Sequence, residues 1–540
     1  MSEQMNEHTE EHIEENQGES KAESKEESKA AAIAAPVKVW KIIITLVMLL
    51  VFTFFTAGVF WALGSWSYLE MDELLWHLKS SLKDANPDMI KSFVLIVGGA
   101  AFLATATGAF FMFNNRKKPG KGRLVYRITT LAATAILLIG LVSAFLGFNV
   151  GPFLKGYMTV STFVEDHYVD PGSVKLTFPE KKRNLVYIYI ESMETTFMDE
   201  ENGGAFPKNV IPELTTLAKE NEDFSGDSGV RNGGISLPGT IWTMGAIFGT
   251  TSGLPLKTPL GQNGMSASDD FFPGVITMGD ILKKEGYRNR LLMGSASDFG
   301  GCALYYQSHG DFEIHDLYYA RKVGRIPKDY FEFWGYEDRK LFEYAREEAL
   351  ELAAGAEPFQ LVLQTMDTHF EDGYVCPECT KEFKGNIYAN VMKCESRQVT
   401  EFVRWLQQQD FYENTTIIIT GDHPTMDKNF TKDVPESYQR KTYTCIINPA
   451  DAADTANKGN EKRVFSTMDL FPTALAALGV TIEGDRLGLG TNLYSDQKTL
   501  TEQMELSQLE EELNARSVML GDMYGGTYVS PGIGTYKDDK

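Results

Sequence analysis

Acidic residues and histidines follow three apolar, β-branched runs of the chain. They are Glu191, the pair Asp367 and His369, and the pair Asp422 and His423 in the stretch "TIIITGDHP". Carboxylate oxygens together with imidazole nitrogens are ligands that Zn²⁺ and Mn²⁺ accept in proteins. A single acidic residue after a strand is more often a turn or a helix cap, so a metal site requires that several of these residues meet.

Two threonines could supply a nucleophile. Thr240 and Thr243 lie in "SLPGTIWTMGAIFGTTSGLPL", where a Pro-Gly turn precedes a segment that can open a helix. A threonine hydroxyl needs activation, for which a metal ion suffices, and a helix N-terminus stabilises bound phosphate or sulfate through its free N–H groups and dipole. The alternative is a threonine that only caps a helix, and the spacing leaves both interpretations open.

The elements that must position these residues alternate between strands and helices. The apolar, β-rich runs are 183–192, 287–295, 358–369 and 414–423, and the helical patterns between them include 278–286, 338–355 and 394–409. Near-continuous apolar strands separated by helices predict an α/β domain with a mostly parallel sheet flanked by helices on both faces. Ligands bind at the carboxyl ends of such strands, which is where the acidic residues and histidines stand.

Three apolar runs near the N-terminus are long enough to span a bilayer. They cover about residues 42–64, 92–113 and 124–148, the last with Arg127 near its start. The loop "NNRKKPGKGR" between the second and third runs is densely basic, and Lys38 and Lys41 flank the first run on the same side. Positive loops stay in the cytoplasm, so we expect a multi-pass cell-membrane protein with a cytoplasmic N-terminus and an extracytoplasmic domain after about residue 150.

Composition narrows the possible partners. The 540 residues carry a net charge of −23, which argues against a nucleic-acid partner because phosphate backbones attract Lys and Arg. The first residues are rich in Glu, Ser, Lys and Ala, a composition typical of disorder. The expected organisation is a disordered acidic cytoplasmic tail (1–37), a membrane region (38–150), a linker (151–180), a catalytic domain (181–500) and a C-terminal segment (501–540).

Three of the five cysteines cluster in "CPECTKEFKGNIYANVMKC". The pair Cys376 and Cys379 could be half of a zinc knuckle, although the sequence shows no obvious fourth ligand nearby. The alternative is a disulfide that joins Cys394 to Cys376 or Cys379, which an extracytoplasmic location favours.

Taken together, these motifs resemble the alkaline phosphatase superfamily, in its membrane-bound, sulfatase-like branch of lipoteichoic acid synthases and phosphoglycerol transferases. The resemblance covers about residues 160–495. It is carried by "NLVYIYIESMETTF", "PELTTLAKE", "LPGTIWTMGAIFGTTSGLPL", "FWGYEDRKLFEYA", "LVLQTMDTHF", "FYENTTIIITGDH", "FSTMDLFPTALAALG" and "RLGLGTNLYS".

The resemblance implies roles for individual residues. Glu191, Asp422 and His423 match the metal ligands, and Thr243, with Thr240 as the alternate, matches the nucleophile that also touches the metal. The residues that match substrate-binding positions are His369 for the phosphate, Trp334 for the glycerol phosphate headgroup and, less closely, His309. One divalent metal ion is implied, with Mn²⁺ expected and Zn²⁺ or Mg²⁺ as alternatives. The C/S-x-P-x-R element that sulfatases convert to formylglycine is missing, which argues against sulfate ester hydrolysis.

The implied activity is a metal-dependent transfer of glycerol phosphate through a covalent threonine intermediate. The donor would be a phosphatidylglycerol-like membrane phospholipid, and the acceptor a glycan, a glycolipid or a polyglycerolphosphate polymer. Two alternatives stay open. A phosphodiesterase or sulfatase-like hydrolase shares every motif and differs only in its product, and a non-catalytic membrane sensor is the second alternative.

Overall fold

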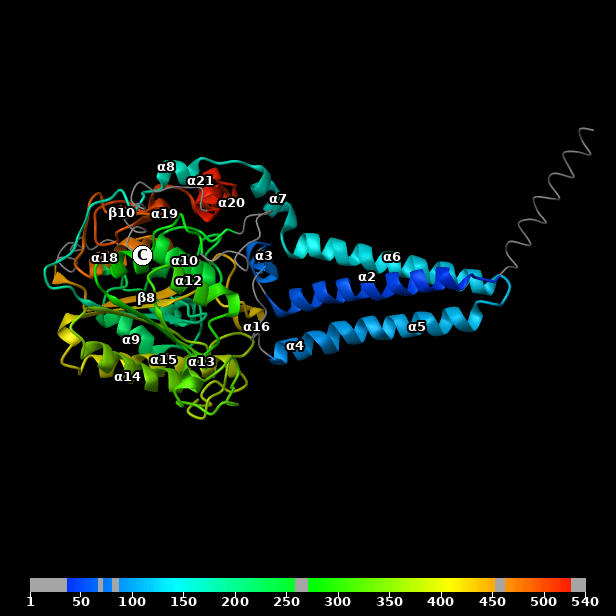
Figure 1. Cartoon of the computed structure of the whole chain (residues 1–540), viewed down its shortest axis with the longest axis horizontal. Coiled ribbons are helices and arrows are strands. Elements are labelled where there is room, and N and C mark those ends of the chain that lie inside the picture. Colours follow the sequence, from blue (N-terminus) through cyan, green and yellow to red (C-terminus); the bar gives the residue numbers. More distant parts are fainter. Residues whose placement is uncertain (1–35, 67–70, 80–86, 258–270, 452–461, 526–540) are drawn as a thin grey trace, which may run out of the picture. The chain divides into compact units, whose positions relative to one another are not determined.

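The computed structural model describes residues 36–66, 71–79, 87–257, 271–451 and 462–525, which fall into two compact units (Figure 1). One unit combines residues up to Ser65 with Pro87–Phe148, and the other combines Trp66–Asn86 with the chain from Asn149 onward. The acidic segment expected over 1–37 lies outside the described residues, apart from its last two positions.

The first unit contains long apolar helices. They are α2 (Val39–Ser65), α4 (Pro87–Phe93), the π-helical turn η1 (Val94–Gly98), α5 (Gly99–Asn115) and α6 (Lys121–Gly147). Three continuous helical segments, Val39–Ser65, Met89–Asn115 and Lys121–Gly147, are long and apolar enough to cross a membrane. The three runs expected from the sequence lie within them except for residue 148, so the prediction of three apolar N-terminal helices is confirmed.

A glycine allows two of these helices to approach closely. A Cβ atom on Gly140 of α6 would lie 2.3 Å from Thr56 Oγ1 of α2. The Thr56 hydroxyl donates to the Ile136 carbonyl oxygen at 2.8 Å. Because only a hydrogen fits at this crossing, any larger residue at Gly140 would push α2 and α6 apart.

The second unit is built on a sheet of seven strands. They are β3 (Gly233–Gly234), β8 (Thr442–Ile447), β7 (Thr415–Gly421), β2 (Asn184–Ile190), β6 (Phe359–Gln364), β4 (Arg288–Met293) and β5 (Glu313–His315), given in their order across the sheet. The five strands from β7 to β5 are parallel, β8 runs antiparallel to β7, and β3 runs antiparallel to β8. The predicted mostly parallel sheet is confirmed.

Each face of the sheet packs against its own layer of helices. Alternate side chains of a strand point to opposite faces; thus Val186, Ile188 and Ile190 of β2 join one buried cluster, while Leu185, Tyr187 and Tyr189 join the other. The first cluster includes residues of α9 (Pro212–Glu220), α14 (Asp338–Ala353) and α15 (Ile387–Leu406). The second includes residues of α10 (Thr243–Ser252), α11 (Met278–Lys284), α12 (Cys302–Ser308) and α18 (Leu470–Ala477). Figure 1 shows α9, α14 and α15 on one side of this unit and α10, α12 and α18 on the other.

The segments that flank the expected catalytic domain are ordered parts of the same unit. The stretch 151–180 forms α7 (Val150–Met158), α8 (Phe163–His167) and β1 (Leu176–Thr177), which pairs with β9 (Thr481–Ile482). The end of the described chain forms α19 (Leu500–Gln503), α20 (Leu506–Asn514) and α21 (Val518–Gly525), whose Leu509, Leu520 and Met523 are buried in the core. The remaining short elements are α13 (Leu317–Lys322), α16 (Lys428–Thr431), β10 (Arg486–Leu487), β11 (Gly490–Thr491), η2 (Thr195–Phe197), η3 (Glu200–Asn202), η4 (Gly226–Ser228), η5 (Phe299–Gly301), η6 (Tyr412–Asn414) and η7 (Thr467–Asp469).

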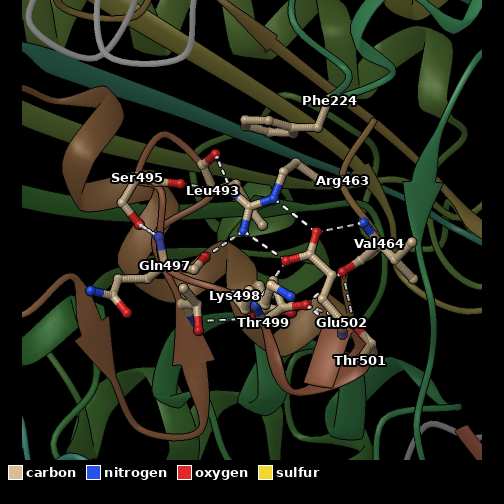
Figure 2. A network of polar contacts seen from close by, with 12 residues as sticks. Phe224, Arg463, Val464, Leu493, Ser495, Gln497, Lys498, Thr499, Thr501 and Glu502 are labelled. Atoms are coloured by element: carbon tan, nitrogen blue, oxygen red, sulfur yellow. Dashed lines mark hydrogen bonds and ion pairs between the residues drawn. The ribbon is translucent and has the colours of Figure 1, made fainter. Parts of the chain in front are cut away.

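A buried ion pair fixes the start of this C-terminal part (Figure 2). The Arg463 guanidinium donates to both carboxylate oxygens of Glu502, at 2.9 and 3.1 Å, and to the carbonyl oxygens of Leu493 and Ser495. Glu502 in turn accepts from the backbone N–H of Thr499, which caps α19. Because one cation satisfies several inward-facing carbonyls and a carboxylate, residues 493–502 are held against the core.

The segment between the first and second apolar helices also belongs to the sheet unit. Helix α3 (Met71–Lys79) buries Trp76, whose indole N–H donates to the Gly300 carbonyl oxygen at 3.0 Å. Asp72 of the same helix forms an ion pair with Lys257 at 3.0 Å. This segment is therefore a structural part of the unit that carries the candidate site.

Candidate active site

Glu191, Asp422 and His423 meet at one edge of the sheet. Strands β2 and β7 are parallel neighbours in which Ile190 pairs with Gly421, so the residues after them emerge side by side. One ligand atom from each of the three side chains lies within 4.8 Å of the other two, and all three residues are buried. The sequence folds this tightly because Gly421 has no side chain, since a Cβ there would lie 1.8 Å from the Met193 carbonyl oxygen.

Hydrogen bonds fix the orientation of these ligand atoms. Asp422 Oδ1 accepts from the backbone N–H groups of Ser192 and His423, each at 2.8 Å, while Asp422 Oδ2 is buried without a hydrogen-bond partner among the described residues. His423 Nδ1 lies 3.0 Å from the Pro424 carbonyl oxygen, which can only accept, so Nδ1 carries the ring proton. His423 Nε2, 3.5 Å from Glu191 Oε1, is then left with its lone pair for a metal ion.

The electrostatics of this group favour a bound cation. Burial, followed by the nearby Glu191 carboxylate, raises the pKa of Asp422 to about 7. Burial opposes protonation of His423, but the Asp422 and Glu191 carboxylates raise its pKa above the ordinary value. Two carboxylates and an imidazole in a buried place form a donor set that fits one divalent metal ion. Asp422 Oδ2 makes no hydrogen bond among the described residues and lies 3.5 Å from His423 Nε2, so both atoms can bind the same ion.

Thr243 stands beside this group at the start of α10. Its Oγ1 lies 3.5 Å from Glu191 Oε2 and 3.4 Å from His423 Nε2. Trp242 is the N-cap residue, in extended conformation and without a side-chain capping bond, so Thr243 is the first residue of the helix. The first N–H groups of a helix have no intrahelical acceptor, and here they open next to the hydroxyl and the acidic group.

Thr240 has a different environment and is not a threonine that caps α10, because the N-cap residue of that helix is Trp242. It is fully buried, and its Oγ1 accepts from the Leu237 N–H and donates to the Leu237 carbonyl oxygen, both at 2.9 Å. These bonds close the Pro-Gly turn, in which Gly239 has a φ of 84°. Thr240 thus stabilises the turn that precedes Thr243 and helps to position it.

His369 follows β6 and packs against aromatic rings. Its ring centroid lies 4.8 Å from that of Trp334 and 5.0 Å from that of Phe370. His369 Nδ1 lies 2.6 Å from the Phe370 carbonyl oxygen, so Nδ1 carries the proton and Nε2 is the acceptor of the neutral ring. Burial is the main cause that lowers the pKa of His369 to about 4.

Trp334 is positioned by a close backbone contact. A Cβ on Gly335 would lie 2.0 Å from the Gly294 carbonyl oxygen, so the loop after β4 and the Trp334 loop meet in a way that only glycine permits. Trp334 is buried, and its indole Nε1 has no hydrogen-bond partner among the described residues. The structure therefore brings the rings of Trp334 and His369 together.

Asp367, which the sequence places on the same rim, is not part of the metal-ligand group. Its Oδ1 accepts from the backbone N–H of Asp338 at 3.2 Å, and Asp338 in turn accepts from the N–H groups of Met366 and Asp367. This reciprocal pair fixes the turn after β6, because each carboxylate satisfies backbone donors of the other segment. Asp367 orders the loop that carries His369.

His309 contacts a different set of residues. Its Nδ1 pairs with Asp280 Oδ2 at 2.9 Å, and its Nε2 lies 2.6 Å from the Phe271 carbonyl oxygen. Both ring nitrogens are thus occupied by the protein at the end of α12. The structure does not bring His309 together with Glu191, Thr243 or His369.

Several supporting residues escaped the sequence analysis. Thr368 Oγ1 donates to the Glu191 carbonyl oxygen at 2.6 Å, and Thr365 Oγ1 accepts from the Glu191 N–H at 3.1 Å. Ser192, with a φ of 55°, donates from its hydroxyl to Glu191 Oε1 at 2.7 Å. The hydroxyl residues that flank the acidic residues in "ESMETT" and "QTMDTH" could have indicated these supporting contacts. The role of Asp338 could not be predicted, because it depends on a contact between distant segments.

Comparison with known families and proteins places this site in a wider group. The family model named Sulfatase matches residues 183–480. The chain is 29% identical to "Phosphoglycerol transferase I" of Salmonella choleraesuis (strain SC-B67) over 438 residues, which are 79% of this chain and 53% of that protein. It is 31% identical to the protein of the same name from Citrobacter koseri over 340 residues, which are 61% of this chain and 41% of that protein. The chain spans about half the length of these relatives.

Solved structures give matches of lower similarity. An alkaline phosphatase superfamily protein from Vibrio parahaemolyticus is 17% identical with a TM-score of 0.49, covering 70% of this chain and 97% of that one. The lipoteichoic acid synthase LtaP from Listeria monocytogenes is 16% identical with a TM-score of 0.46, covering 62% of this chain and 81% of that one.

Proposed function

Because this chain belongs to the sulfatase family, with the family match covering Glu191, Thr243, Asp422 and His423, we propose that it is a phosphoglycerol transferase. It moves glycerol phosphate from a phosphatidylglycerol-like lipid to a hydroxyl acceptor. The similarity to proteins named phosphoglycerol transferase I supports this activity over sulfate ester hydrolysis.

One observation carries the proposal, namely the position of the Thr243 hydroxyl. It lies within 3.5 Å of both Glu191 and His423 and at the N-terminus of α10. A phosphodiester whose phosphorus approaches Thr243 Oγ1 would have its oxygens beside free backbone N–H groups. Such donors stabilise the negative charge that develops on the phosphoryl oxygens in the transition state.

The proposed transfer has two balanced steps. In the first, Thr243 Oγ1 forms a bond to phosphorus, the bond from phosphorus to the diacylglycerol oxygen breaks, and the threonine proton ends on that oxygen. In the second, an acceptor hydroxyl oxygen bonds to phosphorus, the bond to Thr243 Oγ1 breaks, and the acceptor proton restores the threonine. Between the steps the enzyme carries glycerol phosphate as an ester of Thr243, which predicts ping-pong kinetics.

A divalent metal ion held by Glu191, Asp422 and His423 would act as a Lewis acid that polarises the phosphoryl oxygen and lowers the pKa of the adjacent hydroxyl. We expect Mn²⁺, with Zn²⁺ or Mg²⁺ as alternatives, because oxygen ligands outnumber the nitrogen ligand. Ser192 and the backbone of His423 keep the Asp422 carboxylate in place for this role.

His369 and Trp334 form the substrate side of the site. We place the Trp334 ring beside the glycerol headgroup because it packs against the His369 ring. An anionic phosphate next to His369 Nε2 raises the pKa of the ring, because an opposite charge favours the protonated form. We therefore propose that His369 Nε2 relays the threonine proton to the leaving oxygen, so that the first step transfers a single proton.

A groove near the site suits a glycan acceptor. It has a volume of about 530 Å³ and is lined by residues that include Phe206, Phe383, Tyr388, Asp372 and Asp427. Tyr388 donates to the carbonyl oxygen of Thr368, the residue before His369, and contacts Thr425, two residues after His423. A lining that combines aromatic side chains with carboxylates can contact both the apolar faces and the hydroxyls of sugars, so we assign the acceptor to this groove.

A membrane lipid as the donor is consistent with the three apolar helices. A membrane anchor holds the enzyme near an insoluble substrate and raises its effective concentration. We propose that the sheet unit is extracytoplasmic and the N-terminus cytoplasmic, on the basis of the basic loop before α6. Labelling of a cysteine introduced at Ser20 by an impermeant reagent applied to intact cells would contradict this orientation.

The activity is tested with the full-length protein in detergent micelles, Mn²⁺ and phosphatidylglycerol labelled in its glycerol headgroup. The expected result is label transferred to an added oligosaccharide, with diacylglycerol as the second product. Release of free glycerol phosphate at the same rate with and without acceptor would identify the hydrolase alternative. Failure to consume the lipid would contradict both and leave the non-catalytic sensor.

A further inference from the structure

We propose that Cys376, Cys379 and Cys394 bind one zinc ion, which fastens the loop that carries His369 to helix α15. This site is separate from the proposed phosphoglycerol transfer site in its ligands and chemistry. Its three ligand atoms lie within 4.8 Å of one another, and Cys376 and Cys394 are buried. The chain's other two cysteines, Cys302 and Cys445, do not join this group.

The spacing of the sulfur atoms fits a single metal ion. Cys376 Sγ lies 3.6 Å from Cys379 Sγ and 3.6 Å from Cys394 Sγ. A tetrahedral zinc ion with bonds of about 2.3 Å to sulfur separates its sulfur ligands by about 3.8 Å. A disulfide would use two of the three sulfurs and leave the third without a role, whereas one zinc ion uses all three.

Two side-chain N–H donors lie next to the sulfur atoms. The Gln398 amide donates to Cys394 Sγ at 3.6 Å, and the Arg397 guanidinium donates to it at 3.5 Å. N–H donors to sulfur keep thiolates in place and moderate their charge.

One cation lies next to the cluster. Zinc binding to three cysteines releases the thiol protons, and a divalent ion with three thiolates carries a net charge of −1. The Arg397 guanidinium contacts Cys394 Sγ, and it is held there by Glu401 at 2.9 Å and Glu378 at 3.0 Å. Among the described residues no other His, Cys, Asp or Glu ligand atom joins the group, which leaves the fourth position to a water molecule beside the half-buried Cys379.

The site joins two segments that the active site needs in register. Cys376 and Cys379 lie in the loop after β6, in which the Tyr374 N–H donates to the Asp367 carbonyl oxygen at 2.7 Å and the Cys376 N–H donates to the Tyr374 carbonyl oxygen. Cys394 lies in α15, whose Tyr388 donates to the Thr368 carbonyl oxygen. A metal bridge between these segments would therefore limit the movement of His369, which lies between Asp367 and Tyr374.

The test is zinc content of the full-length protein after dialysis against a mild chelator, which removes weakly held ions but spares a thiolate site. The expected result is one zinc per chain in the wild type, in Cys445→Ser and in Asp422→Ala, and none in Cys376→Ser or Cys394→Ser. The Asp422→Ala arm separates this site from the transfer site, so that each proposal can fail alone. Equal zinc in the wild type and both cluster variants would overturn the inference.

A second measurement covers variants that fail to fold. The wild type, denatured with chelator and without reductant, should react as five thiols, because zinc binding keeps the three cluster cysteines reduced and Cys302 and Cys445 are free thiols. A count of three would show a disulfide and overturn the inference. Replacement of the zinc by Co²⁺ in the folded wild type should add a thiolate-to-cobalt charge-transfer band, and its absence would likewise contradict a sulfur-bound metal.

Discussion

Two clusters of possible metal ligands in the same unit differ in chemistry and in position. Glu191, Asp422 and His423 offer oxygen and nitrogen atoms at the carboxyl ends of two parallel strands, with the Thr243 hydroxyl 3.4 to 3.5 Å away. The cysteine cluster offers three sulfur atoms between a loop and a helix, with an arginine and a glutamine as neighbours. Five of their six residues are buried and Cys379 is half-buried, so burial alone does not indicate what a cluster does.

The comparison indicates that the atoms next to the ligands determine whether a cluster takes part in a reaction or only stabilises the fold. A hydroxyl and free helix N–H groups beside a hard-ligand site allow a phosphoryl group to be attacked and its charge stabilised. N–H donors to soft sulfur ligands stabilise a thiolate site and add no nucleophile. We therefore propose that the first cluster takes part in the transfer reaction and that the second holds the loop that carries His369.

The largest effect is expected when one ligand of the Glu191, Asp422 and His423 group is removed. Asp422→Ala should lower turnover by about 10³-fold or more, because loss of a metal that contributes several kcal/mol removes a factor of ten per 1.36 kcal/mol. Turnover of labelled lipid and metal content at the oxygen site provide the measurement, with the exposed Asp410→Ala as the control. Retained activity in Asp422→Ala would remove the distinction between the two clusters.

The next effect concerns pH and the loop between the clusters. The pKa of His369 is lowered to about 4, so between about pH 6.5 and 4 the unfolded chain holds a proton that the folded protein lacks. Stability should fall as pH decreases through that window, by at most about 3 kcal/mol from this group. Thermal unfolding midpoints of wild type and His369→Gln at about pH 7 and about pH 5 measure it. An equal loss in both proteins would show that the protein does not lower the pKa of His369.

A smaller effect is expected at the turn before α10. Thr240→Ala removes two side-chain bonds to Leu237 and should cost about 1–3 kcal/mol of unfolding free energy. Turnover should fall by much less than in Asp422→Ala, since Thr240 does not touch the acidic group. Thr240→Ser keeps the hydroxyl and provides the matched control. A loss of activity as large as that of Asp422→Ala would place Thr240 in the chemistry.

The smallest effect is expected in the groove. Phe383→Ala should raise the KM for the acceptor several-fold, because an aromatic contact is worth about 1 kcal/mol, and should leave the KM for the lipid unchanged. Initial rates at varied acceptor and fixed lipid provide the measurement. A change confined to the lipid KM would move the acceptor away from this groove.

Much of the fold could be predicted from the sequence because its signals are local. The apolar runs of β2, β4, β6 and β7 and the three apolar helices were identified from composition and length, and the expected resemblance to the sulfatase-like family is confirmed. The strands beyond β7 were missed because their direction depends on pairing: β8 and β3 are antiparallel, which no local pattern fixes.

The candidate site was only partly predictable for the same reason. Glu191, Asp422 and His423 could be expected together because adjacent parallel strands end at one edge. Asp367 showed the same pattern, yet it bonds to the N–H of Asp338, a partner 29 residues away that no spacing rule indicates. Thr240 and Thr243 are equally plausible by residue type, and only the contacts of each hydroxyl separate them.

The most direct test is mass spectrometry of the enzyme quenched during turnover with phosphatidylglycerol in the absence of acceptor. We expect a glycerol phosphate adduct on Thr243 that decays when acceptor is added. The adduct should be absent in Thr243→Ala and present in Thr240→Ala. An adduct mapped to Thr240, or one that still forms in Thr243→Ala, would contradict the assignment of Thr243 as the nucleophile.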